Sequence, residues 1–152
     1  MHLDRPAYSY RSDTTIPEFS DDGPRTVMDA KCSICAKGAQ WIAHNDKKKH
    51  FKIIPMQSPL GEALLNHYGM DAKDPLSWLY INEGKASASL DAVMATGYAL
   101  GGVWRGLAIL YLLPRGARDW LYGLVARNRY RFNGKTMICN IVDDAVRERI
   151  IE

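Results

Sequence analysis

The chain has 152 residues, of which 47% are hydrophobic and 24% charged, and its formal net charge at pH 7 is +3. This length fits one domain that can bury a core without covalent staples. Three cysteines are too few for a disulfide scaffold, and an odd number leaves at least one of them unpaired.

Residues 1–24 are polar and rich in turn formers, and they contain no apolar stretch of the kind found in a secretory signal peptide. We interpret them as an N-terminal extension that is partly disordered or bound to the surface. The longest apolar run, Leu107 to Leu113, is far shorter than the roughly 18 to 20 residues of a membrane span. We therefore expect a cytoplasmic protein in a reducing environment, where structural disulfides are rare.

The pattern from residue 25 onward predicts alternating strands and helices. The short, β-branched and apolar segment "RTVMD" predicts a strand. The apolar spacing of "CSICAKGAQWIAHND" indicates a helix that begins near Cys32. "FKIIPM" is a second strand, and a second helix follows with Ser58 as N-cap, Pro59 at its first position and Gly69 as its stop. A strand–helix–strand order predicts parallel pairing through a right-handed crossover.

The second half begins with a hairpin, formed by residues 78–81 and 85–90 around the turn "NEG". Helical patterns follow in "DAVMATGYAL", "VWRGLAILYLL" and "GARDWLYGLVARNRY". The elements predict an α/β, thioredoxin-like fold with a central mixed sheet over residues 25–140, extra helices in its C-terminal part, and a tail at 141–152. All four tryptophans lie in apolar patterns, and we expect them in the core: Trp41, Trp78, Trp104 and Trp120.

Cys32 and Cys35 stand three positions apart where a strand passes into a helix. The unpaired N–H groups and the dipole at a helix N-terminus stabilise a thiolate. Cys32 is nearer to that field, so we expect it to have the lower pKa and to act as the nucleophile, with Lys31 adding a little positive charge. Cys35 lies one turn on and can resolve a mixed disulfide at Cys32.

Two other interpretations of this pair stay open. The cysteines could be small core residues, or they could bind zinc with His44 and His50, in the order Cys-x2-Cys-x8-His-x5-His. The nine-residue step from Cys35 to His44 spans about 13 Å along a helix, which is too far for one metal ion unless the helix is broken. The two histidines fit better as surface residues at a basic helix end.

The segment "MDAKCSIC" resembles the Asp-x-x-Cys-x-x-Cys signature of the DCC family of thiol-disulfide oxidoreductases, also called the domain of unknown function 393. The resemblance continues through "IIPMQSPLGEALLNHYGMD", "LPRGARDWLYGLVARNRYRFNGK" and the late cysteine Cys139, and it covers roughly residues 25 to 140. It implies a thioredoxin-like fold and thiol-disulfide oxidoreductase activity.

The resemblance places Asp29 at the signature aspartate and Cys32 and Cys35 at the dithiol. Asp29 could take the proton of Cys35 as a general base, or it could cap the helix or hold the turn. Three positions depart from the common family pattern without removing a reactive group: Met28, Ala30 and Ser33.

Two further residues have roles only through the resemblance. Thioredoxin-like enzymes carry a cis-proline opposite the dithiol before the third strand, and Pro75 is the nearest candidate for this substrate-binding position, ahead of Pro55. Cys139 could be a second resolving thiol or a buried residue.

The partners expected from this chemistry are a protein or small-molecule disulfide and an electron donor of unknown identity. No cofactor is expected besides the Cys32–Cys35 disulfide itself, and no metal. From Arg105 to Lys135 there are seven basic residues against the single acid Asp119, which could mark an anionic partner or membrane surface, or simply a solvated face. Nucleic acid is not expected. The alternative function is a thioredoxin-like binding or assembly module whose dithiol turns over little.

Overall fold

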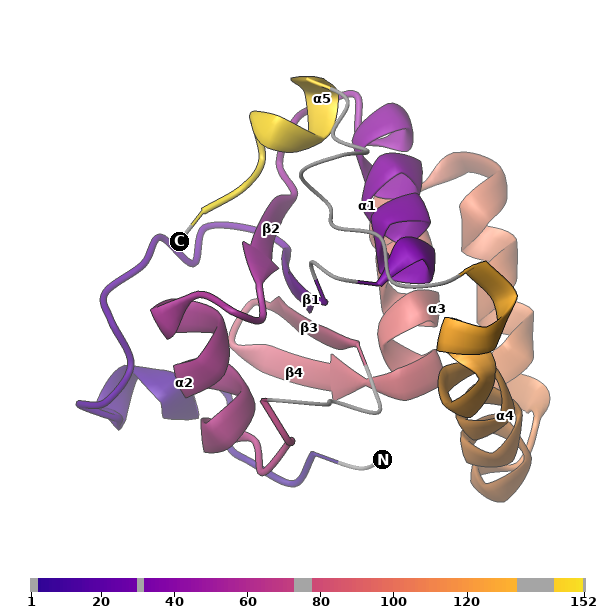
Figure 1. Cartoon of the computed structure of the whole chain (residues 1–152), viewed down its shortest axis with the longest axis horizontal. Helices are drawn as coiled ribbons and strands as arrows, with labels where there is room; N and C mark the ends of the chain where they lie inside the picture. Colours follow the sequence, from indigo (N-terminus) through magenta and orange to yellow (C-terminus); the bar gives the residue numbers. More distant parts are fainter. Residues whose placement is uncertain (1–2, 30–31, 73–77, 134–143, 152) are drawn as a thin grey trace.

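A four-stranded mixed sheet organises the computed structural model, which describes residues 3–29, 32–72, 78–133 and 144–151. The strand order is β2-β1-β3-β4, with β1 parallel to β2 and antiparallel to β3, and with β3 antiparallel to β4. Helices lie on both sides of this sheet (Figure 1). The strands are β1 (Arg25–Met28), β2 (Lys52–Pro55), β3 (Leu79–Asn82) and β4 (Lys85–Ala88).

The connections between strands follow the predicted order. The first strand leads through α1 to β2, and α2 then leads to the β3–β4 hairpin. This arrangement is a thioredoxin-like fold, as the sequence pattern predicts. The helical elements are η1 (Ser9–Ser12), α1 (Ser33–Asn45), α2 (Pro59–His67), α3 (Ser89–Leu100), η2 (Gly102–Leu112), α4 (Arg115–Asn133) and α5 (Asp144–Arg147), where η marks a 3₁₀ helix.

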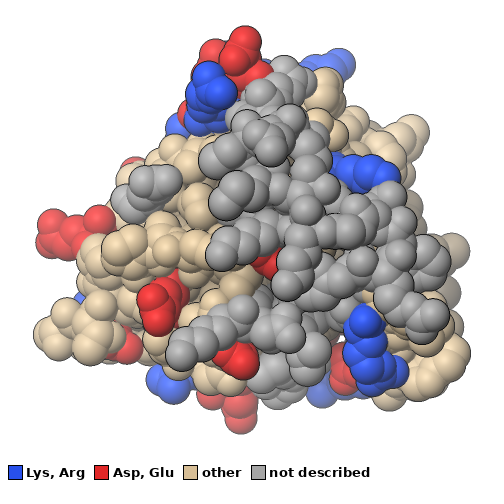
Figure 2. All heavy atoms as spheres, in the orientation of Figure 1, with Lys and Arg blue, Asp and Glu red and all other residues tan. Residues whose placement is uncertain are grey.

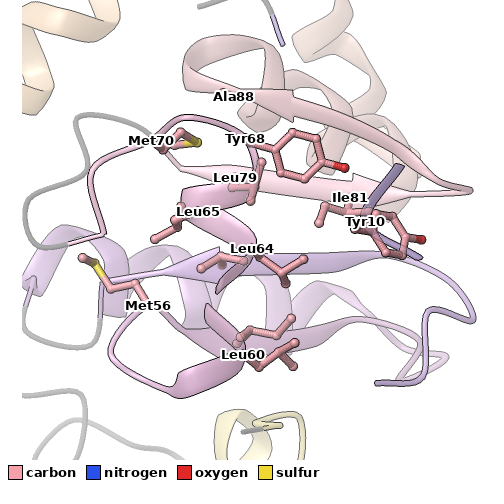
Figure 3. Packing of buried hydrophobic residues seen from close by; sticks show 12 residues of the cluster. Tyr10, Met56, Leu60, Leu64, Leu65, Tyr68, Met70, Leu79, Ile81 and Ala88 are labelled. Atoms are coloured by element: carbon pink, nitrogen blue, oxygen red, sulfur yellow. The ribbon is translucent and has the colours of Figure 1, made fainter. Parts of the chain in front are cut away.

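One face of the sheet packs against α2. Because side chains alternate along a strand, Val27, Ile54 and Leu79 point to this face while their neighbours point to the other. They meet Leu60 and Leu64 of α2, and both leucines are fully buried (Figure 3). Burial of this kind contributes about 1.5–3 kcal/mol for each large aliphatic side chain.

The opposite face packs against α1 and α3. Met28, Ile53 and Tyr80 point to this side, each one position away from a residue of the first cluster. They contact Ile42 of α1 and Ala92 of α3. Since both faces of β1 are covered, all four of its residues are buried, including Arg25 and Thr26.

The predicted starts and stops of α2 are confirmed. The hydroxyl of Ser58 accepts a hydrogen bond from the N–H of Gly61 at 3.1 Å, and Pro59 occupies the first turn. Gly69 has φ +71°, a left-handed conformation that glycine adopts at little cost and that ends the helix. The sequence signals at this helix are local, which is why they could be read without tertiary information.

The segments outside residues 25–140 also pack on the sheet. Tyr10 belongs to the hydrophobic cluster between the sheet and α2. Asp13 Oδ2 lies 2.7 Å from Nδ1 of the buried His67. At the other end of the chain, Val146 is buried in the second cluster and Ile150 forms a parallel bridge with Ile53. The domain boundaries at residues 24 and 140 stay predictions.

The close approach of α2 to β2 depends on Gly61. A Cβ atom there would lie 2.1 Å from the backbone oxygen of Pro55 and 2.9 Å from Met56 Cα, and backbone atoms cannot yield as side chains do. We expect Gly61→Ala to destabilise the fold by about 1–3 kcal/mol through overpacking. Urea unfolding would measure the loss, with Gly69→Asn, which tolerates φ > 0, as a milder comparison. Unchanged stability in Gly61→Ala would contradict this packing.

Two predictions about the C-terminal half need correction. The segment 102–112 is helical as predicted, but it is an eleven-residue 3₁₀ helix with no buried residue, although such runs seldom exceed 3–4 residues. Trp120 is not in the core, because its side chain is 64% exposed. The other three tryptophans are partly buried. No described helix is both long enough and apolar enough to cross a membrane.

Candidate functional site

The dithiol lies where β1 passes into α1. Asp29 directly follows β1, and its carbonyl oxygen accepts a hydrogen bond from the N–H of Cys32 at 3.3 Å, which closes a turn. Cys32 then occupies the N-cap position of α1, and its carbonyl accepts the first helical hydrogen bond, from Ala36 N–H, at 2.9 Å. This places Cys32 at the positive end of the helix dipole, as the sequence predicts.

Cys32 and Cys35 are not joined by a disulfide in this structure, and they differ in accessibility. Cys32 is completely buried, whereas Cys35 is partly exposed. A thiolate at Cys32 therefore has the stabilising helix terminus but no open path to solvent in this structure. Neighbouring atoms must move before a substrate disulfide can reach the Cys32 sulfur.

The proton distribution in the pair is asymmetric. The pKa of the Cys35 thiol is raised, first by its hydrogen bond to Cys32, then by burial and by the negative charge of the Cys32 sulfur. The N–H of Asp29 donates to the Cys35 sulfur and opposes this shift, while the Asp29 charge adds to it. Cys35 therefore keeps its proton as long as the Cys32 sulfur is negatively charged.

Asp29 is a buried carboxylate next to the dithiol. Asp29 is 6% exposed, and Gln57 Nε2 donates a hydrogen bond to Asp29 Oδ1 at 2.8 Å. The N-cap position of α1 belongs to Cys32, three residues later, so Asp29 holds the turn through its backbone rather than occupying the cap. Its side chain stays within electrostatic range of Cys35.

Gln57 is the site residue that the sequence reading missed. It follows β2 by two positions, and Asp29 follows β1 by one. Because β1 and β2 are parallel and in register, with Met28 opposite Pro55, the residues after both strands meet at one edge of the sheet. The predicted parallel pairing of β1 and β2 could have indicated this contact, because it places the ends of the two strands side by side.

Trp78 links the dithiol helix to the sheet and to α4. Its indole N–H donates to the hydroxyl of Thr26 on β1, and its backbone N–H donates to the hydroxyl of Tyr122 on α4 at 3.1 Å. A Cβ on Gly38 of α1 would lie only 3.3 Å from the Trp78 ring. The Trp78 side chain thus lies beside α1 one turn beyond Cys35.

Several residues that the sequence reading singled out do not join this site. His44 and His50 are exposed and lie at and beyond the opposite end of α1, which runs unbroken from Cys35 to His44. Across residues 3–29, 32–72, 78–133 and 144–151, no group of three or more possible metal ligands is found. Some predictions fall outside the described residues: Ala30, Lys31, Pro75 and Cys139.

Comparison with known proteins agrees with this arrangement. A family model described as DCC1-like thiol-disulfide oxidoreductase matches residues 26–135. The uncharacterized protein YuxK of Bacillus subtilis is 26% identical over 134 residues, which cover 87% of this chain and 98% of that protein. A DCC family protein of Arabidopsis thaliana, named as chloroplastic, is 26% identical over 122 residues, which cover 80% of this chain and 71% of that protein. No solved structure matches significantly.

Proposed function

Because the chain belongs to the DCC1-like thiol-disulfide oxidoreductase family, we propose that it exchanges thiols and disulfides through Cys32 and Cys35. The observation that carries the proposal is the asymmetry of the pair at the N-terminus of α1. Cys32 occupies the N-cap of α1, and its hydrogen bond to Cys35 raises the pKa of the Cys35 thiol; both support Cys32 as the nucleophile. The substrate is a protein or small-molecule disulfide.

The first step forms a bond between the Cys32 sulfur and one sulfur of the substrate disulfide. The substrate S–S bond breaks, and its other sulfur leaves as a thiolate. The product is a mixed disulfide at Cys32. Since Cys32 then carries no negative charge, the largest cause that raises the pKa of Cys35 disappears, and only burial and the Asp29 charge still raise it.

The second step is attack by Cys35 on the Cys32 sulfur. Cys35 loses its proton to the carboxylate of Asp29, which Gln57 holds by a hydrogen bond. The Cys32–Cys35 bond forms, and the bond from Cys32 to the substrate breaks, so that the second substrate sulfur leaves as a thiolate. The substrate gains two electrons and the protein loses two.

Return to the dithiol needs an external thiol reductant, whose identity is open. The electrons reside in the Cys32–Cys35 pair itself, so the cycle requires no other cofactor and no metal. A reducing compartment such as the cytoplasm suits a protein that works as a reductant.

The test is a trapped intermediate. Cys35→Ser, in a Cys139→Ser background, removes the resolving sulfur and leaves the nucleophile in place. With glutathione disulfide we expect a stable one-to-one glutathione adduct on Cys32 in the intact mass, because serine cannot displace it. Cys32→Ser with Cys35 retained is the matched control, and it should form much less adduct. Equal adducts in the two variants would contradict the assigned roles.

A further inference from the structure

The exposed apolar side chains gather on one part of the surface. Among the residues that the structure describes, every exposed large apolar or aromatic side chain except Tyr8 lies between Tyr98 and Val125. These residues belong to the end of α3, to η2 and to α4, which stand together at the edge of the molecule beyond α3 (Figure 1). A concentration of this kind marks an interaction surface.

Along η2 the exposed residues form a ridge. Val103, Ile109 and Leu112 are separated by multiples of three, and side chains three positions apart eclipse one another in a 3₁₀ helix. Val103 is 86% exposed and Leu112 is 83% exposed. The opposite side of η2 packs on α3, where Leu107 lies against Gly97. The ridge therefore points away from the molecule.

Helix α4 also presents apolar side chains to solvent. Two polar interactions join it to the rest of the protein: Arg118 pairs with Asp91 of α3, and the Tyr122 hydroxyl accepts a hydrogen bond from Trp78 N–H. Its exposed stripe is apolar and follows the spacing of one helix face: Trp120, Leu121, Leu124 and Val125. The cation of Arg118 also lies 5.3 Å from the ring of Tyr111, which ties α4 to the end of η2.

The charged residues of the segment that carries this apolar surface are almost all arginines. Residues 92–133 contain six arginines, no lysine and one acid, Asp119. Arg118 is buried and paired, but Arg105, Arg115 and Arg127 are exposed. Figure 2 shows basic side chains, with acidic atoms next to them, beside uncharged surface on this side of the molecule. The partner must therefore offer both apolar depth and negative charge.

We propose that this η2–α4 face, made of the η2 ridge, the α4 stripe and the three exposed arginines, docks on an anionic lipid bilayer. Tryptophan and arginine beside aliphatic side chains are the residues that bind at the boundary between headgroups and acyl chains. A second copy of the chain fits less well. In a two-fold dimer the same patch faces itself, which would bring the arginines of both copies together.

Vesicle binding by the full chain tests this proposal. We expect co-sedimentation with phosphatidylcholine vesicles that contain 30% phosphatidylglycerol, and at least about tenfold weaker binding to pure phosphatidylcholine. High salt should weaken the interaction because it screens the arginines. Absence of binding to the anionic vesicles at low salt would overturn the proposal.

Two variants with matched controls separate the apolar and charged contributions. Trp120→Ser with Leu124→Ser should weaken binding at least about tenfold, whereas Tyr8→Ser, the exposed aromatic residue outside the face, should not. Arg115→Glu with Arg127→Glu should do the same. Arg5→Glu with Arg147→Glu makes an equal charge change at two exposed arginines outside the face and should have little effect. Thermal unfolding confirms that each variant is folded.

The same variants distinguish other occupants of the face. If the wild-type protein dimerised in light scattering and the Trp120→Ser, Leu124→Ser variant did not, the face would belong to a second copy, and the membrane proposal would be wrong. If both pairs of substitutions in the face left vesicle binding unchanged, the η2–α4 face would not be the membrane-binding surface, and the proposal would also be wrong. Disulfide exchange in solution should be unchanged in all of these variants.

Discussion

Cys32→Ser is expected to lower the rate of disulfide exchange by at least about 10³-fold, because the hydroxyl that replaces the thiol is not ionised at neutral pH and is a poor nucleophile toward sulfur. The partly exposed Cys35 cannot take over, since burial and the Asp29 charge keep the pKa of its thiol raised even without Cys32. Reduction of insulin by the protein in the presence of dithiothreitol measures the rate. All of these variants also carry Cys139→Ser, so that no cysteine other than Cys32 and Cys35 is present.

Cys32→Ala provides the matched comparison. Cys32 is completely buried, so the loss of a polar or polarisable atom there can affect packing as well as chemistry. If both variants unfold at the wild-type temperature and both lack exchange, the loss is chemical. Substantial exchange by a folded Cys32→Ser protein would show that Cys32 is not the nucleophile, and a dithiol with little turnover, as in a binding module, would then fit better.

Asp29→Asn is expected to slow the resolution of the mixed disulfide by about 10²-fold at pH 7, the usual contribution of a general base. Two effects compete in this variant. Removing the negative charge lowers the pKa of Cys35, which helps ionisation, but it also removes the proton acceptor. Burial still keeps Cys35 protonated at pH 7, so we expect the loss of the acceptor to dominate.

The pH profile separates a proton acceptor from a purely structural residue. In Asp29→Asn the rate should rise with pH as the Cys35 thiol ionises by itself, and the deficit should shrink, because a raised pKa means that the reactive thiolate forms only on the alkaline side. Stopped-flow release of thionitrobenzoate from Cys32 measures this step. Asp46→Asn, which removes another buried carboxylate at the far end of α1, is the control. A rate at or above wild type in Asp29→Asn would contradict the base role.

The fold could be predicted from the sequence where the signals are local. Ser58, Pro59 and Gly69 define α2 by capping chemistry and backbone conformation, which act within a few residues. The dithiol was found in the same way, because its position depends only on the passage from β1 into α1.

Features that depend on tertiary contacts were less visible. Tyr10 is buried because it packs against the cluster around α2, and the sequence of residues 1–24 has no periodicity that predicts this burial. Gln57 meets Asp29 only because β1 and β2 pair in register. Trp120 was expected in the core because apolar patterns normally face inward, but α4 is held by Arg118 and Tyr122 on its inner side.

The most direct measurement is a redox titration of the Cys32–Cys35 pair in the Cys139→Ser protein. The protein is equilibrated in glutathione or dithiothreitol buffers of known potential, its free thiols are alkylated, and the two states are counted by intact mass. We expect one reversible two-electron transition between about −270 and −200 mV, the range of thioredoxins and glutaredoxins. A pair that forms no disulfide at any potential would contradict the proposed exchange.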